Sequence, residues 1–269
     1  MINDWLTVTF LRLPHFKGKT RLESILLHGF RHPRKFKVYR ELLMELDYAE
    51  WTQLQLIRGH WLEPRTLACY EKLLRLGDVF IDVGAHVGFH ALVGRKAVGA
   101  EGLVIAVEPQ PYNSFKILRN FRANGFTNLK LFVAAVSDVS GTAELCDQDI
   151  TDRSVLTMLE VGGKNEAQKF TVPLLRLDSI FESVGERRIK LLKLDVEGLE
   201  IEAVKGLGDR IKCVDNLLFE LLERNPSPRT LDLFSLLEEE GFEIRTLDGV
   251  PWIHGTPIPE RNLLASRGG

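Results

Sequence analysis

A glycine-containing stretch in the first half of the chain constrains the fold more than any other feature. The apolar run 79–81 is typical of a short buried strand, and residues 89–93 are typical of the start of a helix. Between them lies Asp82-Val-Gly-Ala-His-Val-Gly88, in which Gly84 and Gly88 allow a tight turn and a close approach to a ligand. A strand that turns through glycines into a helix is the nucleoside-binding unit of doubly wound α/β proteins.

Downstream of this stretch the chain alternates between strand-like and helix-like segments, which predicts a mostly parallel α/β sheet with helices packed on it. Further strands are expected at 103–107, 130–134, 189–195, 216–220, 242–246 and 262–265, and helices at about 88–98, 111–123, 198–205 and 228–240. Short strand-like runs between 142 and 174 predict a small β insertion. With 269 residues, the chain is long enough for one such domain and a smaller appendage.

Residues 1–60 are expected to form a helical segment ahead of a domain that spans residues 61–269. Between 42 and 57, apolar residues recur at three- and four-residue steps, which is typical of helices. We expect two or three helices that act as a cap or as an oligomerisation surface, so a homo-oligomer is one expected form of the protein.

Basic side chains are concentrated in the same N-terminal segment, although the net charge of the whole chain is only −2. Within residues 1–40, two acids, Asp4 and Glu23, stand against nine basic residues: Arg12, Lys17, Lys19, Arg21, Arg31, Arg34, Lys35, Lys37 and Arg40. Such asymmetry can mark a contact with a phosphate, a nucleic acid or a membrane surface. It is also typical of a solvated, loosely attached segment, so the sequence leaves both interpretations open.

The composition, 45% hydrophobic and 27% charged, is that of a soluble globular protein. No stretch approaches the ~18 consecutive apolar residues of a membrane span. The N-terminus has an acid, Asp4, where a signal peptide would be basic. Cys69, Cys146 and Cys213 are far apart and match neither a metal-binding spacing nor an even disulfide set. We therefore expect a cytoplasmic protein with reduced thiols.

The spacing of glycines and acids indicates which nucleoside the loop would bind. The segment from Gly84 to Gly88 is G-x-x-x-G and lacks the third glycine of a dinucleotide fingerprint, which disfavours a nicotinamide dehydrogenase. Glu108 ends the next strand 20 residues after Gly88, close to the ~20 expected for an acid that binds ribose. Asp82 and Glu108 suit a ligand with a positive centre and no phosphate, such as S-adenosylmethionine, and His86 is expected to line it. With Glu108 in place, the alternative that the glycines only make a tight turn becomes weaker.

Acids follow several of the expected strands at the edge where α/β sheets bind ligands. Four strands end on a carboxylate, namely on Asp82, Glu108, Asp195 and Glu220. Crowded carboxylates are costly unless a cation compensates them, which again favours a cationic ligand. Asp82 is expected to support the loop or to meet the amino acid part of the cofactor.

Further roles follow from position along the sheet. Ser137 and Asp138 come after the third strand and are expected to meet the adenine edge. Asp195 and Glu197 are expected nearest the reactive methyl group, where one of them would act as the base. Asp195 could instead cap the helix that follows it by accepting backbone N–H bonds. No metal ion is expected, because the cofactor roles account for most of the acids.

The order of five motifs resembles a known family. The motifs are Asp82-Val-Gly-Ala-His-Val-Gly-Phe89, Val107-Glu-Pro109, Arg176-Leu-Asp-Ser179, Lys193-Leu-Asp-Val-Glu-Gly198 and Asn262-Leu-Leu-Ala265. Together they resemble the FkbM-type S-adenosylmethionine-dependent methyltransferases over roughly residues 61–266. The resemblance implies a Rossmann-like methyltransferase sheet whose last strand is antiparallel, and usually O-methylation of a small molecule or a sugar. It does not fix the acceptor.

Other functions remain open at the level of sequence. A nucleic-acid methyltransferase could use the basic N-terminal segment to grip phosphates, but the chain shows no interleaving of aromatic and basic residues for base stacking. A non-catalytic binding protein on the same fold is disfavoured by the intact set of acids. Because residues 1–60 match none of the family motifs, the specificity for the acceptor is expected to lie there and in the insertion.

Overall fold

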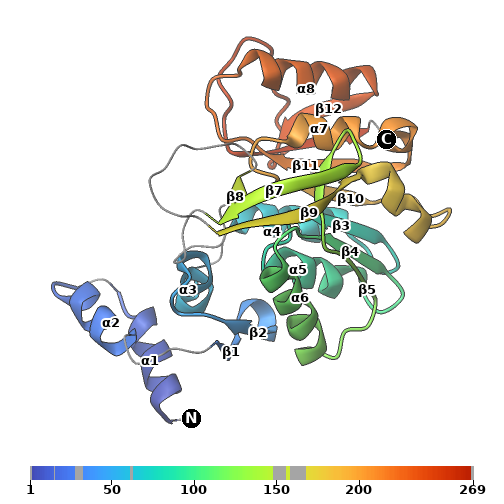
Figure 1. Cartoon of the computed structure of the whole chain (residues 1–269). Coiled ribbons are helices and arrows are strands. Elements are labelled where there is room, and N and C mark those ends of the chain that lie inside the picture. Colours follow the sequence, from blue (N-terminus) through green and yellow to red (C-terminus); the bar gives the residue numbers. More distant parts are fainter. Residues whose placement is uncertain are drawn as a thin grey trace.

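The computed structural model describes residues 2–14, 16–27, 33–60, 63–147, 156–157 and 168–267. A seven-stranded sheet lies at its centre, with helices on both sides (Figure 1). The strand order is β12-β13-β11-β10-β3-β4-β5. The strands are β3 (Val79–Val83), β4 (Leu103–Val107), β5 (Leu129–Phe132), β10 (Leu191–Leu194), β11 (Asn216–Glu220), β12 (Phe242–Thr246) and β13 (Asn262–Arg267).

The sheet has the predicted topology. Strands β5, β4, β3, β10 and β11 are paired in parallel, whereas β13 runs antiparallel to both β11 and β12. The last strand is therefore antiparallel, as the family resemblance implied. The chain builds outward from β3 in one direction through β4 and β5, and then in the other direction through β10 and β11. This reversal puts a topological switch point between β3 and β10, where α/β sheets bind ligands.

Alternation along β3 shows why the central strands are apolar almost throughout. Val79, Ile81 and Val83 point into one core, while Phe80 points into a second core on the opposite face. The first face is covered by α7 (Glu200–Lys205), α8 (Pro228–Glu239), η2 (Leu177–Ser183) and η3 (Gly208–Cys213). The second face is covered by α4 (Pro64–Leu73), α5 (Phe89–Val98) and α6 (Pro111–Ala123). A parallel sheet with both faces covered needs such continuous apolar strands.

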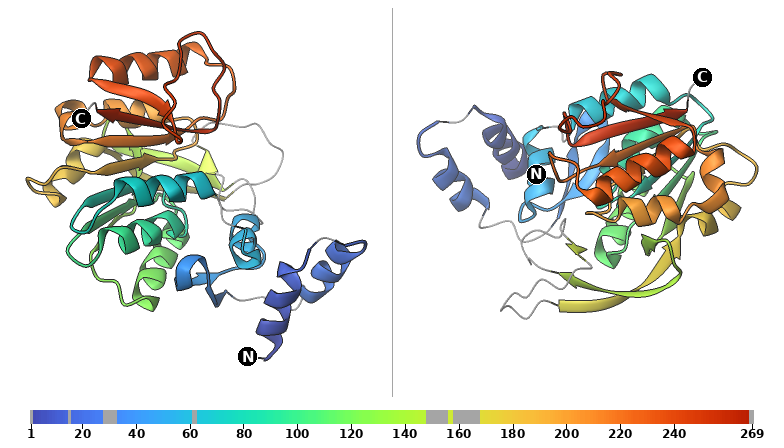
Figure 2. Two further views of the ribbon diagram at one scale, coloured as in Figure 1. Left: turned by 180° about the vertical axis from the view of Figure 1, so that it is seen from behind. Right: turned by 90° about the horizontal axis from the view of Figure 1, so that it is seen from above.

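The predicted β insertion forms a second sheet. Its strand order is β6-β9-β7-β8, with bounds β6 (Ala135–Ser137), β7 (Gly141–Asp147), β8 (Leu156–Thr157) and β9 (Gln168–Arg176). Figure 2 shows β7 and β9 as a long ribbon beside the main sheet. The remainder of the insertion, residues 148–155 and 158–167, lies outside the described residues.

The N-terminal segment is only partly helical. It contains α1 (Ile2–Arg12), α2 (Lys19–Leu27) and α3 (Trp51–Arg58), but also β1 (Arg34–Lys37), the single turn η1 (Tyr39–Glu41) and β2 (Leu43–Leu46). The prediction of helix around residues 42–46 was wrong, because β1 and β2 form an antiparallel hairpin. Leu42, Met44 and Leu46 are buried and fit the two-residue period of a strand. Since Leu42 and Leu46 are also four residues apart, the same leucines imitate a helical pattern.

The second half of this segment is packed into the domain. Phe36 and Met44 of the hairpin belong to the same buried cluster as Ile117 and Phe121 of α6. Helices α1 and α2 reach away from the body of the domain (Figure 1). Arg12 fastens α1 by donating to the carbonyl of Ile57 at 3.2 Å. No helix in the described part of the chain is long and apolar enough to cross a membrane.

Candidate active site

The glycine loop after β3 is shaped by contact with the end of β10. Gly84 has a φ of +79°, and a Cβ placed on it would lie 1.8 Å from the carbonyl oxygen of Asp195. Gly88 has a φ of +85°, and a Cβ there would lie 3.1 Å from Cγ1 of Ile117. The glycines therefore first serve close backbone packing between the loop, β10 and α6. Their predicted approach to a ligand remains a prediction.

Glu108 holds this loop in place from the end of β4. Its carboxylate accepts hydrogen bonds from the backbone N–H of His86 at 2.8 Å and of Gln110 at 3.0 Å. The first bond restrains His86, which has a left-handed φ of +49°. Burial raises the pKa of Glu108 to about 7, although the two N–H donors and Asn113 oppose the shift. Glu108 thus holds the loop through the backbone of His86, and its contact with the ribose remains a prediction.

Asp82, the last but one residue of β3, is a fully buried acid. Its side chain has no exposed surface, and neither oxygen meets a donor in good hydrogen-bonding geometry among the described residues. The ammonium of Lys193 lies 4.0 Å from Oδ1. Burial raises the pKa of Asp82, while Lys193 and His90 oppose the shift. The backbone N–H of Ala91 also favours the ionised form of this buried carboxylate.

Lys193 links Asp82 to Asp195. Its Nζ lies 2.8 Å from Oδ2 of Asp195, and the lysine side chain is 2% exposed. Burial alone would lower the pKa of Lys193, but Asp195, Asp82 and Glu63 outweigh it and raise the pKa. Burial likewise favours the neutral form of Asp195, yet Lys193 lowers the pKa of that carboxyl to about 2. Asp195 is therefore ionised at neutral pH.

Three carboxylates converge beside this ion pair. Glu63 precedes α4, Asp195 follows β10 and Glu220 ends β11, and one oxygen of each lies within 4.8 Å of the others. Burial and the charge of Asp195 raise the pKa of Glu220 to about 8, even though Arg261 lies 2.6 Å away. We call Glu63, Asp195 and Glu220 the carboxylate cluster.

Polar groups on the neighbouring elements surround the cluster. Glu63 accepts from Thr66 at 2.8 Å and from Asn262 at 2.6 Å. Its other oxygen lies 3.8 Å from Nε2 of His90, whose Nδ1 is 3.1 Å from the hydroxyl of Tyr70. Burial lowers the pKa of His90, as does Lys193, and the nearby carboxylates oppose the shift.

The segment after Asp195 does not have the geometry expected if Asp195 capped the next helix. Asp195 does not cap the following helix: the N-cap position of α7 is Leu199, which makes no side-chain cap bond, and the carboxylate of Asp195 faces Lys193. Gly198 instead donates to Glu200 at 3.2 Å. Glu197 has a left-handed φ of +52° and is solvent-exposed, in contrast to the buried groups around Lys193.

Ser137 and Asp138 lie at the end of β6, in the second sheet. Ser137 donates to Asp138 at 3.1 Å, and Arg176 holds the carbonyl of Asp138 at 2.6 Å. Arg176 also binds the carboxylate of Asp178 at 2.6 Å. A Cβ on Gly206, which ends α7, would lie 2.3 Å from the carbonyl of Ser137. The Arg176–Ser179 motif thus fastens this strand end against α7, and contact with adenine remains a prediction.

A comparison with known families decides what this arrangement belongs to. The family model described as the methyltransferase FkbM domain matches residues 82–244, more than half of the chain. The chain belongs to the FkbM methyltransferase family. It is 28% identical over 241 residues to the methyltransferase sdnD of Sordaria araneosa, covering 78% of this chain and 92% of that protein. It is 26% identical over 194 residues to methyltransferase 1 of Beauveria bassiana, covering 65% and 77%.

Solved structures include an FkbM methyltransferase from Methylobacillus flagellatus. The match has a TM-score of 0.45 and 16% identity, and it covers 98% of this chain and 58% of that chain. The assignment of the fold rests on the strand order described above rather than on this likeness.

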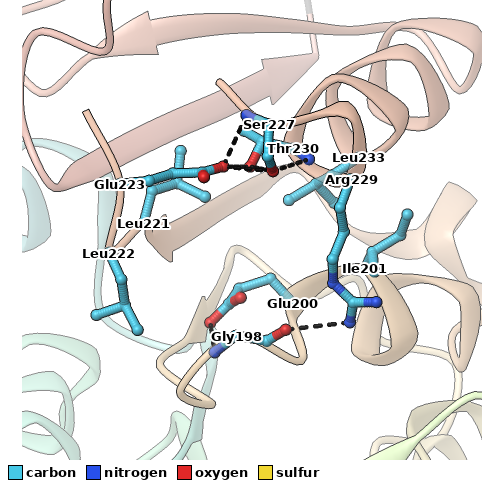
Figure 3. A pocket seen from close by; sticks show the side chains of 10 residues that line it. All are labelled: Gly198, Glu200, Ile201, Leu221, Leu222, Glu223, Ser227, Arg229, Thr230 and Leu233. Carbon is cyan, nitrogen blue, oxygen red and sulfur yellow. Dashed lines mark hydrogen bonds between the residues drawn. The ribbon is translucent and has the colours of Figure 1, made fainter. Parts of the chain in front are cut away.

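The FkbM methyltransferase also has a pocket on the face of the sheet that α7 and α8 cover. It encloses about 190 Å³ between the loop before α7, the end of β11 and the start of α8 (Figure 3). Arg229 crosses it to the carbonyl of Gly198 at 3.1 Å, and Glu223 accepts from Ser227 at 2.7 Å. Leu221 and Leu233 give it an apolar side. Along the edge of the sheet, this pocket is on the β11 side of the switch point.

Sequence reasoning missed part of the site. Lys193 is part of the motif Lys193–Gly198, but no role was predicted for it. A lysine inside an apolar strand is rare and indicates a paired buried charge. Glu63 gave no signal, because it reaches the cluster through the tertiary fold from the turn before α4. Asn262 also stood in a quoted motif, and only strand pairing places it beside Glu220.

Proposed function

We propose that this FkbM methyltransferase transfers the methyl group of S-adenosylmethionine to a hydroxyl of a small molecule or a sugar. The observation that carries the proposal is the excess of carboxylates over cations at the switch point. Asp82, Asp195 and Glu63 are gathered around one buried cation, Lys193. A sulfonium ligand that also carries an amino group would offset this charge, whereas a dinucleotide would add two phosphates to it.

The residues present fit this cofactor. Glu108 would accept from ribose hydroxyls while it still holds the loop, because a carboxylate has about four lone-pair sites. Asp82 has no exposed side-chain surface, so it would support the loop and Lys193 rather than touch the amino group. S-adenosylmethionine supplies the electrophilic methyl group when it is bound, with a neutral thioether as leaving group. The protein's main task is alignment, which can contribute up to ~7–11 kcal/mol.

The acceptor hydroxyl must also lose its proton. In our proposal the Asp195–Glu220 pair takes it, since the two carboxyls lie within 4.8 Å of each other and the charge of Asp195 raises the pKa of Glu220. A base works best when its pKa is near the working pH. By that criterion Glu220, with a pKa of about 8, is better matched than Asp195. Asp195 would orient the acceptor and hold the carboxyl of Glu220 in place. Of the predicted catalytic pair Asp195 and Glu197, Glu197 has less support, because it is exposed.

The cofactor assignment is tested by calorimetric titration of the protein with S-adenosylhomocysteine. Glu108→Ala removes both the predicted ribose contact and the restraint on His86, so the dissociation constant is expected to rise by at least about tenfold. Glu101→Ala is the matched control, because Glu101 is an exposed glutamate in the loop before β4. An unchanged affinity in Glu108→Ala, or stabilisation of the protein by NAD alone, would refute the assignment.

Nucleic acid remains the second candidate acceptor. The basic residues of the N-terminal segment give it little support, because several of them already have partners within the protein. Arg12 and Lys19 donate to backbone carbonyls within the segment, and Lys37 and Arg40 pair with Glu41 and Glu71. Binding of RNA over a range of salt concentrations tests this candidate, since phosphate contacts make the affinity fall steeply with salt. Tight, salt-dependent binding of RNA would favour it over a small molecule.

A further inference from the structure

Helix α2 exposes its apolar residues and buries its charged ones. Leu22, Ile25 and Leu26 have the three- and four-residue spacing that places side chains on one side of a helix, and they are 46%, 64% and 40% exposed. Lys19 and Glu23 are one turn apart, and each is only 7% exposed. A surface helix normally has the reverse arrangement, with its apolar stripe against the core and its charges in water. The apolar stripe of α2 is therefore available to a partner.

Polar contacts hold α2 in this orientation. Nζ of Lys19 donates to the carbonyl of Leu11, in the last turn of α1, at 2.9 Å and to that of Leu13 at 2.5 Å. Glu23 pairs with Lys19 at 3.5 Å and with Arg58, the last residue of α3, at 2.6 Å. The charged side of α2 is therefore the side that packs on the rest of the protein. The apolar stripe cannot turn inward without breaking these contacts.

Other apolar side chains extend the exposed surface along the same part of the chain. We call residues 2–27, which hold α1 and α2, the arm; it reaches away from the body of the domain (Figures 1 and 2). Leu6 is 54% exposed, and Leu13 and Phe16, between the two helices, are 46% and 41% exposed. The arm thus carries six of the sixteen exposed large hydrophobic side chains in the described part of the chain. Such a concentration is typical of a surface that contacts a protein or a membrane.

The exposed charges of the arm all have one sign. Among the described side chains of residues 6–27, the exposed charged ones are Arg12, Lys17 and Arg21, and Arg21 lies one turn before Ile25 on α2. The surface therefore fits an occupant that is apolar within and negatively charged at its edge. Contact with the same surface of a second copy would bring cations together at the rim. An anionic bilayer offers acyl chains to the apolar stripe and phosphates or carboxylates to the cations.

We propose that the arm binds the surface of an anionic lipid bilayer. Leu22, Ile25 and Leu26 enter the boundary between headgroups and acyl chains, and Lys17 and Arg21 contact the headgroups. A helix that lies in this boundary does not have to span the bilayer, and the 9 residues of α2 are enough for it. The body of the methyltransferase stays in water on the opposite side of the arm. The inference does not depend on the cofactor or on the methyl acceptor.

Flotation of the full chain with lipid vesicles tests the proposal without any assay of activity. The vesicles are phosphatidylcholine with about 30% phosphatidylserine, and pure phosphatidylcholine is the comparison. We expect the protein to float with the anionic vesicles. Binding should be weaker by at least about tenfold on pure phosphatidylcholine, and it should weaken on the anionic vesicles as the salt concentration rises.

Two variants of the arm separate its apolar and charged parts. Ile25→Glu puts a charge in the apolar stripe and is expected to weaken binding to the anionic vesicles by at least about tenfold. Lys17→Ala combined with Arg21→Ala is expected to have a similar effect there, of about tenfold, because each cation near an anionic surface contributes separately. Ile253→Glu is the matched control, because Ile253 is 67% exposed but lies between β12 and β13, and it should bind as the wild type does.

Three outcomes would overturn the proposal. The first is no association of the wild type with the anionic vesicles. The second is equal association of the wild type and Ile25→Glu, each shown by thermal unfolding to be folded. The third is a dimer in sedimentation equilibrium that Ile25→Glu converts to a monomer, because a second copy of the chain would then cover the apolar stripe.

Discussion

The two sides of the switch point hold their carboxylates in opposite ways. On the β4 side, Glu108 is buried among donors, with N–H groups of His86 and Gln110 directed at it. On the β10 and β11 side, the carboxylates of Glu63, Asp195 and Glu220 face one another. One acid is satisfied by the backbone, whereas the other three are held by side chains: Asp195 by Lys193, Glu220 by Arg261, and Glu63 by Thr66 and Asn262.

This difference shows that an acid at the end of a strand can have either of two roles. A carboxylate that accepts backbone N–H bonds fixes the shape of a loop. A group of carboxylates that crowd each other stores electrostatic free energy, which a cationic ligand can release. The first side is therefore expected to respond to mutation mainly through the geometry of the loop, and the second mainly through charge.

The largest effect is expected where the two sides touch. Gly84→Ala would put a methyl group 1.8 Å from the carbonyl of Asp195 and force a left-handed φ on alanine. Since both groups are backbone, β3 and β10 would have to separate. We expect a loss of more than about 4 kcal/mol in the free energy of unfolding, measured by denaturant titration.

Gly185→Ala is the matched control for this prediction. Gly185 also has a positive φ, +69°, but a Cβ there meets nothing within 4 Å. Only the conformational cost of about 1–2 kcal/mol should appear. Equal losses in the two variants would mean that the contact between Gly84 and Asp195 does not join the two sides.

The second prediction removes Lys193, the buried cation beside Asp82 and Asp195. Lys193→Met leaves Asp82 and Asp195 without it, and breaking a buried ion pair in this way costs about 3–5 kcal/mol. Lys190→Met is the control, because Lys190 and its partner Asp215 are partly exposed at 35% and 29%, and its loss should cost less than about 1 kcal/mol.

The dependence on pH gives this prediction a sign. In the wild type the pKa of Asp195 is lowered from 3.8 to about 2, so its stabilising contribution is complete above pH 3.8 and is lost as the pH falls toward 2. In Lys193→Met, burial would raise the pKa of the same carboxyl above its unfolded value. The variant should therefore be closest to the wild type at low pH and lose stability as the pH rises. A loss that does not change with pH would contradict the electrostatic explanation.

Sequence reasoning recovered the main sheet because its signals are local. The strand from Val79, the helix Pro111–Ala123 and the acid Glu108 each depend on a short pattern that the structure reproduces. The hairpin at 34–46 was missed for the same reason, because four-residue spacing of Leu42 and Leu46 fits both a strand and a helix.

The charged side of the site could be predicted only in part. Asp195 and Glu220 follow neighbouring strands, so their proximity follows from sheet topology. Glu63 and Asn262 reach them from a turn and from an antiparallel strand, and no sequence spacing relates these positions. The pairing of Asp195 with Lys193, two residues earlier on one strand, depends on both side chains pointing to one face.

The third prediction concerns turnover on the charged side. Asp195→Asn keeps the size of the side chain but removes its negative charge. In the wild type this charge faces Lys193 and raises the pKa of Glu220. With a methyl acceptor found among hydroxylated small molecules, we expect turnover to fall by about 10²-fold. The dissociation constant for S-adenosylhomocysteine should change by less than about threefold, since Glu108 is untouched. Near-normal turnover would remove Asp195 from the catalytic pair.

The smallest effect is expected on the satisfied side, in the dependence of cofactor affinity on pH. Burial raises the pKa of Glu108 from 4.5 to about 7, so the carboxyl is protonated in part near neutral pH. The folded protein binds this proton more tightly than the unfolded chain, and Glu108 therefore costs stability as the pH rises from 4.5 to 7.

A ligand that donates ribose hydroxyls needs the ionised form of Glu108. Between about pH 6 and 8 the ionised fraction rises roughly tenfold for a pKa near 7, and the affinity for S-adenosylhomocysteine should rise by up to the same factor. Glu108→Gln keeps an acceptor oxygen but cannot ionise, so any pH dependence that it retains belongs to the ligand's amino group or to the carboxylate cluster. If the two proteins showed the same pH profile, Glu108 would act on the loop alone, and the ribose would have to be held by other residues.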